Sequence, residues 1–135
     1  MSIDGSCHCG NIKYSLKTEL SHKDLFYRKC TCSFCTKQGA IYTSDPSGSL
    51  HIDVVDPNKV TIYRFSTKLI DFVFCTTCGV MPIARISIES QNFGVINTTT
   101  SNFDLGFVEI AALEVSNESN IGSIERRRKT WTPIF

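Results

Sequence analysis

Seven cysteines are the residues of this 135-residue sequence whose spacing could best support chemistry. They form three short clusters: Cys7 and Cys9, then Cys30, Cys32 and Cys35, then Cys75 and Cys78. Thiolates are preferred zinc ligands, and a zinc ion in a protein takes four ligands in a tetrahedron. Two distant pairs can close one such site, whereas a cluster of three leaves one position open. This division into four and three ligands uses every cysteine.

Closed zinc sites are usually structural, and sites with an open position are usually catalytic. Spacing alone does not establish which clusters combine, although Cys7 and Cys9 need ligands from another segment. One alternative is a second structural zinc at the Cys30 cluster, closed by a water or a histidine. A redox pair at Cys75 and Cys78 would require a following helix, but the next residues, 79–82, indicate a turn and a strand.

The charge and the apolar pattern exclude other classes. Fourteen basic and thirteen acidic residues leave a net charge of +1, which argues against a general nucleic-acid or membrane-surface binder. No apolar run approaches the roughly 18–20 residues of a membrane span, and the first residues lack the apolar region of a signal peptide. An odd cysteine count does not suit a disulfide framework. We therefore expect a soluble, cytoplasmic protein.

The apolar pattern predicts a single, mainly β domain over residues 1–135. Alternation of period two runs over 12–16, 50–54 and 60–65, and further β-rich runs occupy 25–28, 40–43, 71–75, 82–88, 94–98 and 107–115. Turn residues separate them, for example at Asn92–Gly94. Single helical turns are expected at Ser33–Lys37 and Ser101–Leu105, and nothing longer is expected to be helical. The basic run within Glu125–Lys129 is interpreted as solvated, before an aromatic packing tail.

The three histidines, His8, His22 and His51, do not have a spacing that requires metal binding. His8 lies between two candidate ligands, so its ring is expected to point away from their metal. His22 lies in a polar stretch, and His51 lies in an alternating strand. We interpret all three as surface or packing residues.

Three motifs carry a family resemblance: GSCHCG at 5–10, CTCSFCTKQG at 30–39 and FCTTCG at 74–79. Together they resemble the glutathione-dependent formaldehyde-activating enzyme family, which also includes centromere protein V. YRFST at 63–67 and RRRKTWTP near the end are similar too, so the resemblance covers residues 3–133. It implies a β-tent fold with two zinc ions. The structural zinc would be held by Cys7, Cys9, Cys75 and Cys78, and the catalytic zinc by Cys30, Cys32 and Cys35.

The implied reaction joins a glutathione thiol to formaldehyde as S-hydroxymethylglutathione, or cleaves that carbon–sulfur bond. An open zinc site would lower the pKa of a thiol from about 8.5 and keep it nucleophilic. Lys37 resembles the family's basic residue after the third cysteine, and with Arg64 it is a candidate for binding glutathione carboxylates. Lys68 and Arg85 are further candidates. The expected partner is a small-molecule thiol adduct.

Two other classes remain open from the sequence. One is a non-catalytic, zinc-organised binding module for a protein or nucleic-acid partner, for which Arg126–Lys129 is the one supporting basic run. The other is thiol redox chemistry or zinc storage, in which Cys30, Cys32 or Cys35 would oxidise readily and release metal.

Overall fold

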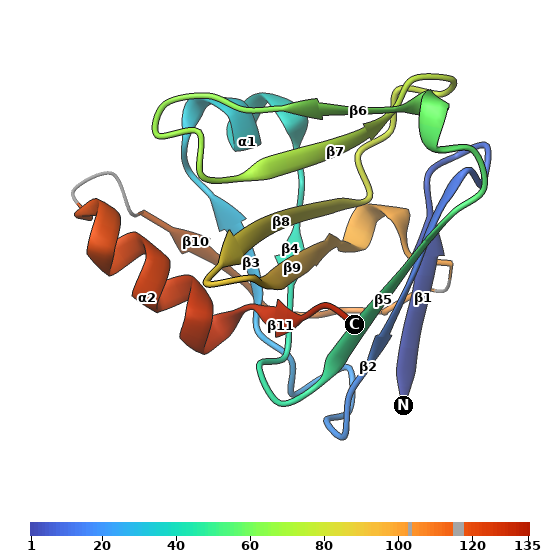
Figure 1. The fold of residues 1–135 in the computed structure, drawn as a ribbon. Coiled ribbons are helices and arrows are strands. Elements are labelled where there is room, and N and C mark those ends of the chain that lie inside the picture. Colours follow the sequence, from blue (N-terminus) through green and yellow to red (C-terminus); the bar gives the residue numbers. More distant parts are fainter. Residues whose placement is uncertain (103, 115–117) are drawn as a thin grey trace.

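The computed structural model describes residues 1–102, 104–114 and 118–135, which form two β-sheets and two α-helices (Figure 1). The smaller sheet is antiparallel and has the strand order β1-β2-β5. Its strands are β1 (Ser2–Ser6), β2 (Ile12–Lys17) and β5 (Ser49–Val54). The predicted alternation over 12–16 and 50–54 therefore corresponds to two neighbouring strands of one sheet.

The larger sheet has the strand order β10-β3-β4-β9-β8-β7-β6. The short strand β11 is not part of this order but pairs with β9. Its strands are β3 (Tyr27–Cys30), β4 (Tyr42–Thr43), β6 (Val60–Tyr63), β7 (Asp71–Cys75), β8 (Ile83–Ile88), β9 (Gln91–Asn97), β10 (Ile110–Leu113) and β11 (Thr132–Pro133). Only β10 and β3 pair in parallel among the described strands. The prediction of a mainly β fold with short antiparallel strands is confirmed.

The helical segments are short. They are α1 (Ser33–Gln38), α2 (Asn120–Thr130) and the single 3₁₀ turns η1 (Pro57–Lys59) and η2 (Thr98–Thr100). The turn predicted at Ser33–Lys37 is thus present as α1. Two predicted segments extend over positions outside the described residues. The turn predicted at Ser101–Leu105 contains residue 103, and the strand predicted over 107–115 ends at residue 115.

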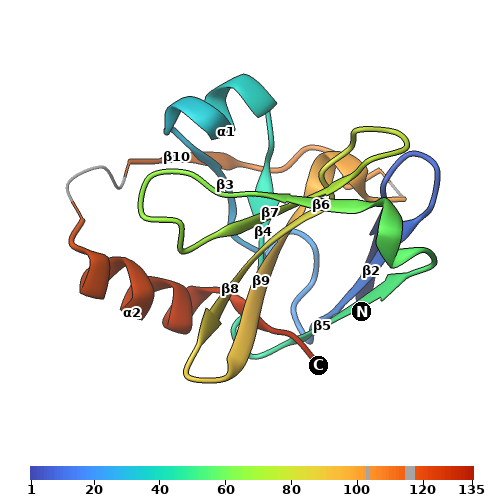
Figure 2. The same cartoon turned by 45° about the horizontal axis from the view of Figure 1, so that its top comes forward.

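Successive side chains of the central strands point to opposite faces of the large sheet and build two separate cores. One core contains Val73, Ile83 and Ile96 together with side chains of the small sheet. The other contains Phe72, Ala84 and Val95 together with side chains of α1 and the end of α2. Figure 1 and Figure 2 agree with this arrangement, since α2 and the small sheet lie on opposite sides of β8 and β9.

The expectation that nothing beyond a turn or two is helical is wrong, because α2 has eleven residues. Its sequence carries no apolar stripe of helical period, so the pattern gave no signal. The helix begins where the Ser119 side chain accepts a hydrogen bond from the Gly122 amide at 3.0 Å. Arg126 and Glu118 form an ion pair at 2.9 Å, and Ile124 packs on the second core. Arginine and lysine also favour helix.

Two smaller expectations also change. The basic run within Glu125–Lys129 is not simply solvated, because only 21% of the Arg126 side chain is exposed to solvent. The turn predicted at Asn92–Gly94 is instead part of β9. The chain reverses earlier, at Glu89 and Ser90, which both have positive φ and form a two-residue hairpin loop.

The described residues contain no helix that is long and apolar enough to cross a membrane.

Candidate metal centres

The four cysteines of the first candidate centre lie on two hairpins with the same local geometry. In the β1–β2 hairpin the Cys7 amide donates to the Ile12 carbonyl at 2.9 Å, and Gly10 has a φ of +84°. In the β7–β8 hairpin the Cys75 amide donates to the Val80 carbonyl at 3.0 Å. Gly79, the residue after Cys78, has a φ of +76°, a conformation that favours glycine. Each turn therefore presents its cysteines toward the other.

The sulfur positions fit a tetrahedral zinc ion. Cys7, Cys9, Cys75 and Cys78 have ligand atoms that all lie within 4.8 Å of one another. The Sγ–Sγ distance is 3.8 Å between Cys7 and Cys9 and 3.5 Å between Cys9 and Cys75. Sulfurs at the corners of a tetrahedron with 2.3 Å bonds would be about 3.8 Å apart. This set, the four-cysteine centre, could hold a metal ion.

Backbone amides favour the thiolate form of Cys75 and Cys78, two of the four cysteines in this centre. The Asn11 amide also lowers the pKa of Cys9, but hydrogen bonding to Cys75 and burial outweigh this effect and raise the pKa of Cys9 to about 11. The amide of Cys78 hydrogen-bonds to the Cys75 sulfur and, despite burial, the pKa of Cys75 is lowered. Burial by itself raises the pKa of Cys78, but amides of Cys9 and Val80 reverse the effect and lower it to about 6. Because metal-binding thiols must be deprotonated, these amides favour the ligand form.

The second candidate centre, the three-cysteine centre, lies where β3 passes into α1. Cys30 ends β3, Cys32 caps α1, and Cys35 lies in its first turn. The Cys32 sulfur accepts a hydrogen bond from the Cys35 amide at 3.3 Å, and Gly39 ends the helix with a φ of 72°. The three sulfurs all lie within 4.8 Å of one another. They supply three of the four ligands that zinc prefers.

The cysteines of the three-cysteine centre differ in pKa, because one thiol donates a hydrogen bond to another. A hydrogen bond from the Cys35 thiol lowers the pKa of Cys30 to about 5, while the same bond, followed by burial, raises the pKa of Cys35. The Tyr42 hydroxyl lies 3.5 Å from the Cys35 sulfur. Burial and then the neighbouring thiolates raise the pKa of Tyr42, so its hydroxyl stays protonated and can donate to the cluster.

A cavity of about 250 Å³ opens directly on the three-cysteine centre. All three cysteines and Tyr42 line it, and Phe65, Phe72 and Trp131 supply apolar wall. Phe34 of α1 packs on Phe72 and Phe65 with ring centroids 4.5 and 5.4 Å away, which fixes α1 against the large sheet. The volume is slightly below the usual range of ligand pockets, about 300–1,000 Å³, and suits a small molecule or the reacting end of a larger one.

Three arginines that line this cavity, Arg28, Arg126 and Arg127, were not among the predicted site residues. Arg126 is paired with Glu118. The Arg127 guanidinium stacks on Trp131, 5.2 Å from the ring centroid, and donates through Nη1 to Ser123. Its Nε is buried without a hydrogen-bond partner among the described residues, which typically costs about 1–3 kcal/mol. In the sequence, residues 123, 127 and 131 have an i, i+4 spacing, which is typical of one helix face and could have indicated that these side chains lie together.

The predicted carboxylate-binding residues lie elsewhere. Lys37 is exposed on α1, and Arg64 pairs with Asp71 at 2.5 Å with half of its side chain exposed. Arg85 also pairs with Asp71, at 3.2 Å, and Lys68 is exposed. None of these four lines the cavity. Their role in binding glutathione stays a prediction.

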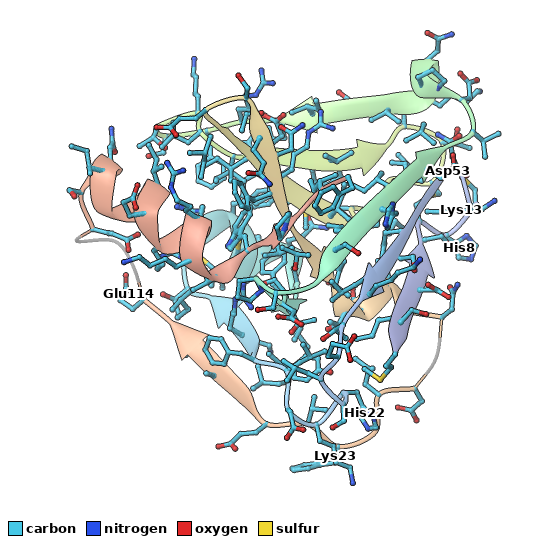
Figure 3. All side chains as sticks on the ribbon, turned by 60° about the horizontal axis from the view of Figure 1, so that its bottom comes forward. His8, Lys13, His22, Lys23, Asp53 and Glu114 are labelled. Atoms are coloured by element: carbon cyan, nitrogen blue, oxygen red, sulfur yellow. The ribbon has the colours of Figure 1, made fainter. Side chains whose placement is uncertain are left out.

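The histidines do not join either centre among the described residues. Figure 3 places His8 beside Lys13 and Asp53, with its ring pointing outward from the small sheet. His51 is exposed, and His22 is half-buried near Lys23. The positions agree with the interpretation of all three as surface or packing residues.

Comparison with known proteins identifies the family. The family model described as glutathione-dependent formaldehyde-activating enzyme matches residues 2–112, a range that includes both cysteine centres. The chain belongs to this family. A crystal structure of a protein from Rhodobacter sphaeroides is 27% identical and superposes with a TM-score of 0.60, covering 82% of this chain and 99% of that one. Helix α2 lies beyond the range that the family model matches.

Proposed function

We propose that this protein is a zinc-dependent carbon–sulfur lyase or synthase acting on the adduct of an aldehyde with glutathione or a similar thiol. The observation that carries the proposal is a group of three cysteine sulfurs, one ligand fewer than zinc prefers, on the wall of a small cavity. The four-cysteine centre lies in the other core and would hold a structural zinc. Membership of the glutathione-dependent formaldehyde-activating enzyme family supports the choice of substrates.

The reaction adds a thiol across a carbonyl group. The sulfur–carbon bond forms, the carbonyl double bond becomes single, and the thiol proton ends on the new hydroxyl; the lyase direction reverses these changes. A zinc ion held by three thiolates would keep the substrate thiol deprotonated near neutral pH. No oxidant or reductant is needed.

The chain's own groups would position the reactants. The apolar wall of Phe65, Phe72 and Trp131 limits water around the reacting carbon. The Tyr42 hydroxyl is held beside Cys35 and remains protonated, so it orients the cluster by donating a hydrogen bond. Phe34 locks α1, and with it Cys32 and Cys35, against the sheet.

We also propose a reducing, cytoplasmic compartment. All seven cysteines are free thiols, and their sulfurs are grouped as ligand sets rather than as disulfides. Oxidising compartments favour disulfides, which would consume these ligands.

The test is the rate of exchange between isotope-labelled formaldehyde and S-hydroxymethylglutathione, measured by NMR exchange spectroscopy. Zinc-loaded wild-type protein should raise the rate at least about tenfold over buffer, equivalent to about 1.4 kcal/mol of barrier. The Cys32→Ser variant should remain folded and fall to the buffer rate. A wild-type rate equal to that of buffer would overturn the proposal and favour the zinc-organised binding module.

A further inference from the structure

The cavity at the three-cysteine centre has an excess of positive charge on its wall. Its charged lining residues, apart from the cysteines, are Arg28, Arg126, Arg127 and Glu118. Glu118 pairs with Arg126, with both carboxylate oxygens near the Arg126 Nε, at 3.1 and 2.9 Å. Among the described residues no ion pair joins Arg28 or Arg127 to a carboxylate. Burial lowers the pKa of Arg127, and the charge of Glu118 partly offsets this effect.

Arg28 is satisfied by neutral partners. Its Nη1 donates to the Phe26 carbonyl at 3.1 Å and its Nη2 to the Ser44 hydroxyl at 2.8 Å. These bonds, together with stacking on Phe26, hold the side chain between β3 and the segment after β4. Arg28 therefore has a structural role that needs no ligand.

Arg127 differs, because its guanidinium is held in place and yet incompletely bonded. Trp131 and Ser123 fix its orientation, and its Nε is buried with no partner among the described residues. Burial, then the charge of Arg126, lowers the pKa of Arg127 to about 10, so the group remains a cation at neutral pH in a poorly solvated place. A buried cation of this kind favours an anionic partner.

Arg127 is also close enough to the cysteine centre to act on the same small molecule. Cys30, Cys35 and Arg127 all line one cavity of about 250 Å³. A molecule whose sulfur reaches the cysteines can therefore place a second group at Arg127 without leaving the cavity.

We propose that Arg127 binds a carboxylate of the thiol substrate and so makes this site selective for acidic thiols. The inference rests on the proposed function, and it assigns specificity to α2, a helix outside the range matched by the family model. Arg127 is thus a specificity-determining residue. Arg127 lines the cavity, so a carboxylate bound there would meet its guanidinium in the orientation that Trp131 and Ser123 fix.

Calorimetric binding to the zinc-loaded protein tests this with two thiols that differ only in charge, N-acetylcysteine and its neutral amide. Wild type should bind the acid at least about tenfold more tightly. Arg127→Gln should bring this ratio close to one, and Arg127→Lys should restore part of it. The control is Arg128→Gln on the same helix, because Arg128 pairs with Glu89 and Glu125 outside the cavity; it should keep the full ratio.

A third ligand, N-acetylalanine, keeps the carboxylate but lacks the thiol, and it separates this inference from the proposed function. Equal binding of acid and amide by wild type, or a ratio unchanged in Arg127→Gln, would overturn the role of Arg127 while leaving thiol chemistry intact. Binding of N-acetylalanine that needs Arg127 and equals that of N-acetylcysteine would support the carboxylate site and contradict the thiol site. Binding of none of the three would overturn both.

Discussion

At the scale of single residues, Asp71 shows how a side chain outside the cavity can shape it. Its carboxylate accepts hydrogen bonds from Arg64, on one side of the segment 64–70, and from Arg85 on β8. That segment supplies Phe65, Ser66, Thr67 and Ile70 to the cavity wall. The ion pair between Arg64 and Asp71 thus joins the two ends of a loop that forms part of the cavity wall, and the pair with Arg85 ties this loop to β8.

The loop should loosen in acid. Burial alone would raise the pKa of Asp71, but hydrogen bonds from Arg64 and Arg85 lower it below its ordinary value. A lowered carboxyl pKa stabilises the fold above the unfolded-state value of about 3.9, and this stability is lost as pH falls through the lowered value. Asp71→Asn should therefore lower the melting temperature by about 2–4 °C at neutral pH and have progressively less effect toward pH 3.

The control for this prediction is Asp53→Asn, because Asp53 is exposed on β5. It should leave both the melting temperature and its acid dependence close to wild type. An effect of Asp71→Asn that is constant between pH 7 and pH 3 would contradict an origin in ionised Asp71.

At the scale of elements, the two cysteine centres depend on different units. The four-cysteine centre joins the β1–β2 hairpin of the small sheet to the β7–β8 hairpin of the large sheet. The three-cysteine centre is built from the single β3–α1 connection. Loss of the first should separate two sheets, whereas loss of the second should disturb one turn.

Serine substitutions should separate these roles. Cys75→Ser should lower the melting temperature by at least about 10 °C, because a metal site absent from the unfolded chain adds its binding free energy to folding. Cys32→Ser should lower it by less than about 5 °C. Differential scanning calorimetry of the two zinc-loaded variants measures both values, and equal losses would contradict the assignment of structural and open centres.

The elements also show what the sequence could reveal. The division of seven cysteines into four and three was accessible from ligand number, but spacing left open which clusters combine, and the family resemblance implied the two sets that the structure brings together. Helix α2 was not predicted, because it has no apolar stripe of helical period and packs on a sheet that is distant in the sequence; the Ser119 cap is a local feature but does not show how far the helix extends. Arg126 and Arg127 were missed for the same reason, because that helix brings them to the cavity, whereas Arg28 reaches it from β3.

At the scale of the whole molecule, the large sheet separates two cores, and each core contains one cysteine centre. Cys7 and Cys75 belong to the core shared with the small sheet, and Cys35 belongs to the core beneath the helices. The alternation of the strands predicted buried faces, but it could not reveal which faces meet. Pairings such as β10 with β3 join residues about eighty positions apart, and local pattern does not encode them.

The proposed function requires two zinc ions in each chain, one in the four-cysteine centre and one in the three-cysteine centre. The most direct test is the number of zinc equivalents per folded chain, measured by elemental analysis for wild type and for Cys32→Ser. We expect two equivalents in wild type and one in the variant, with the remaining zinc resistant to excess glutathione. A single equivalent in wild type that survives Cys32→Ser unchanged would contradict it.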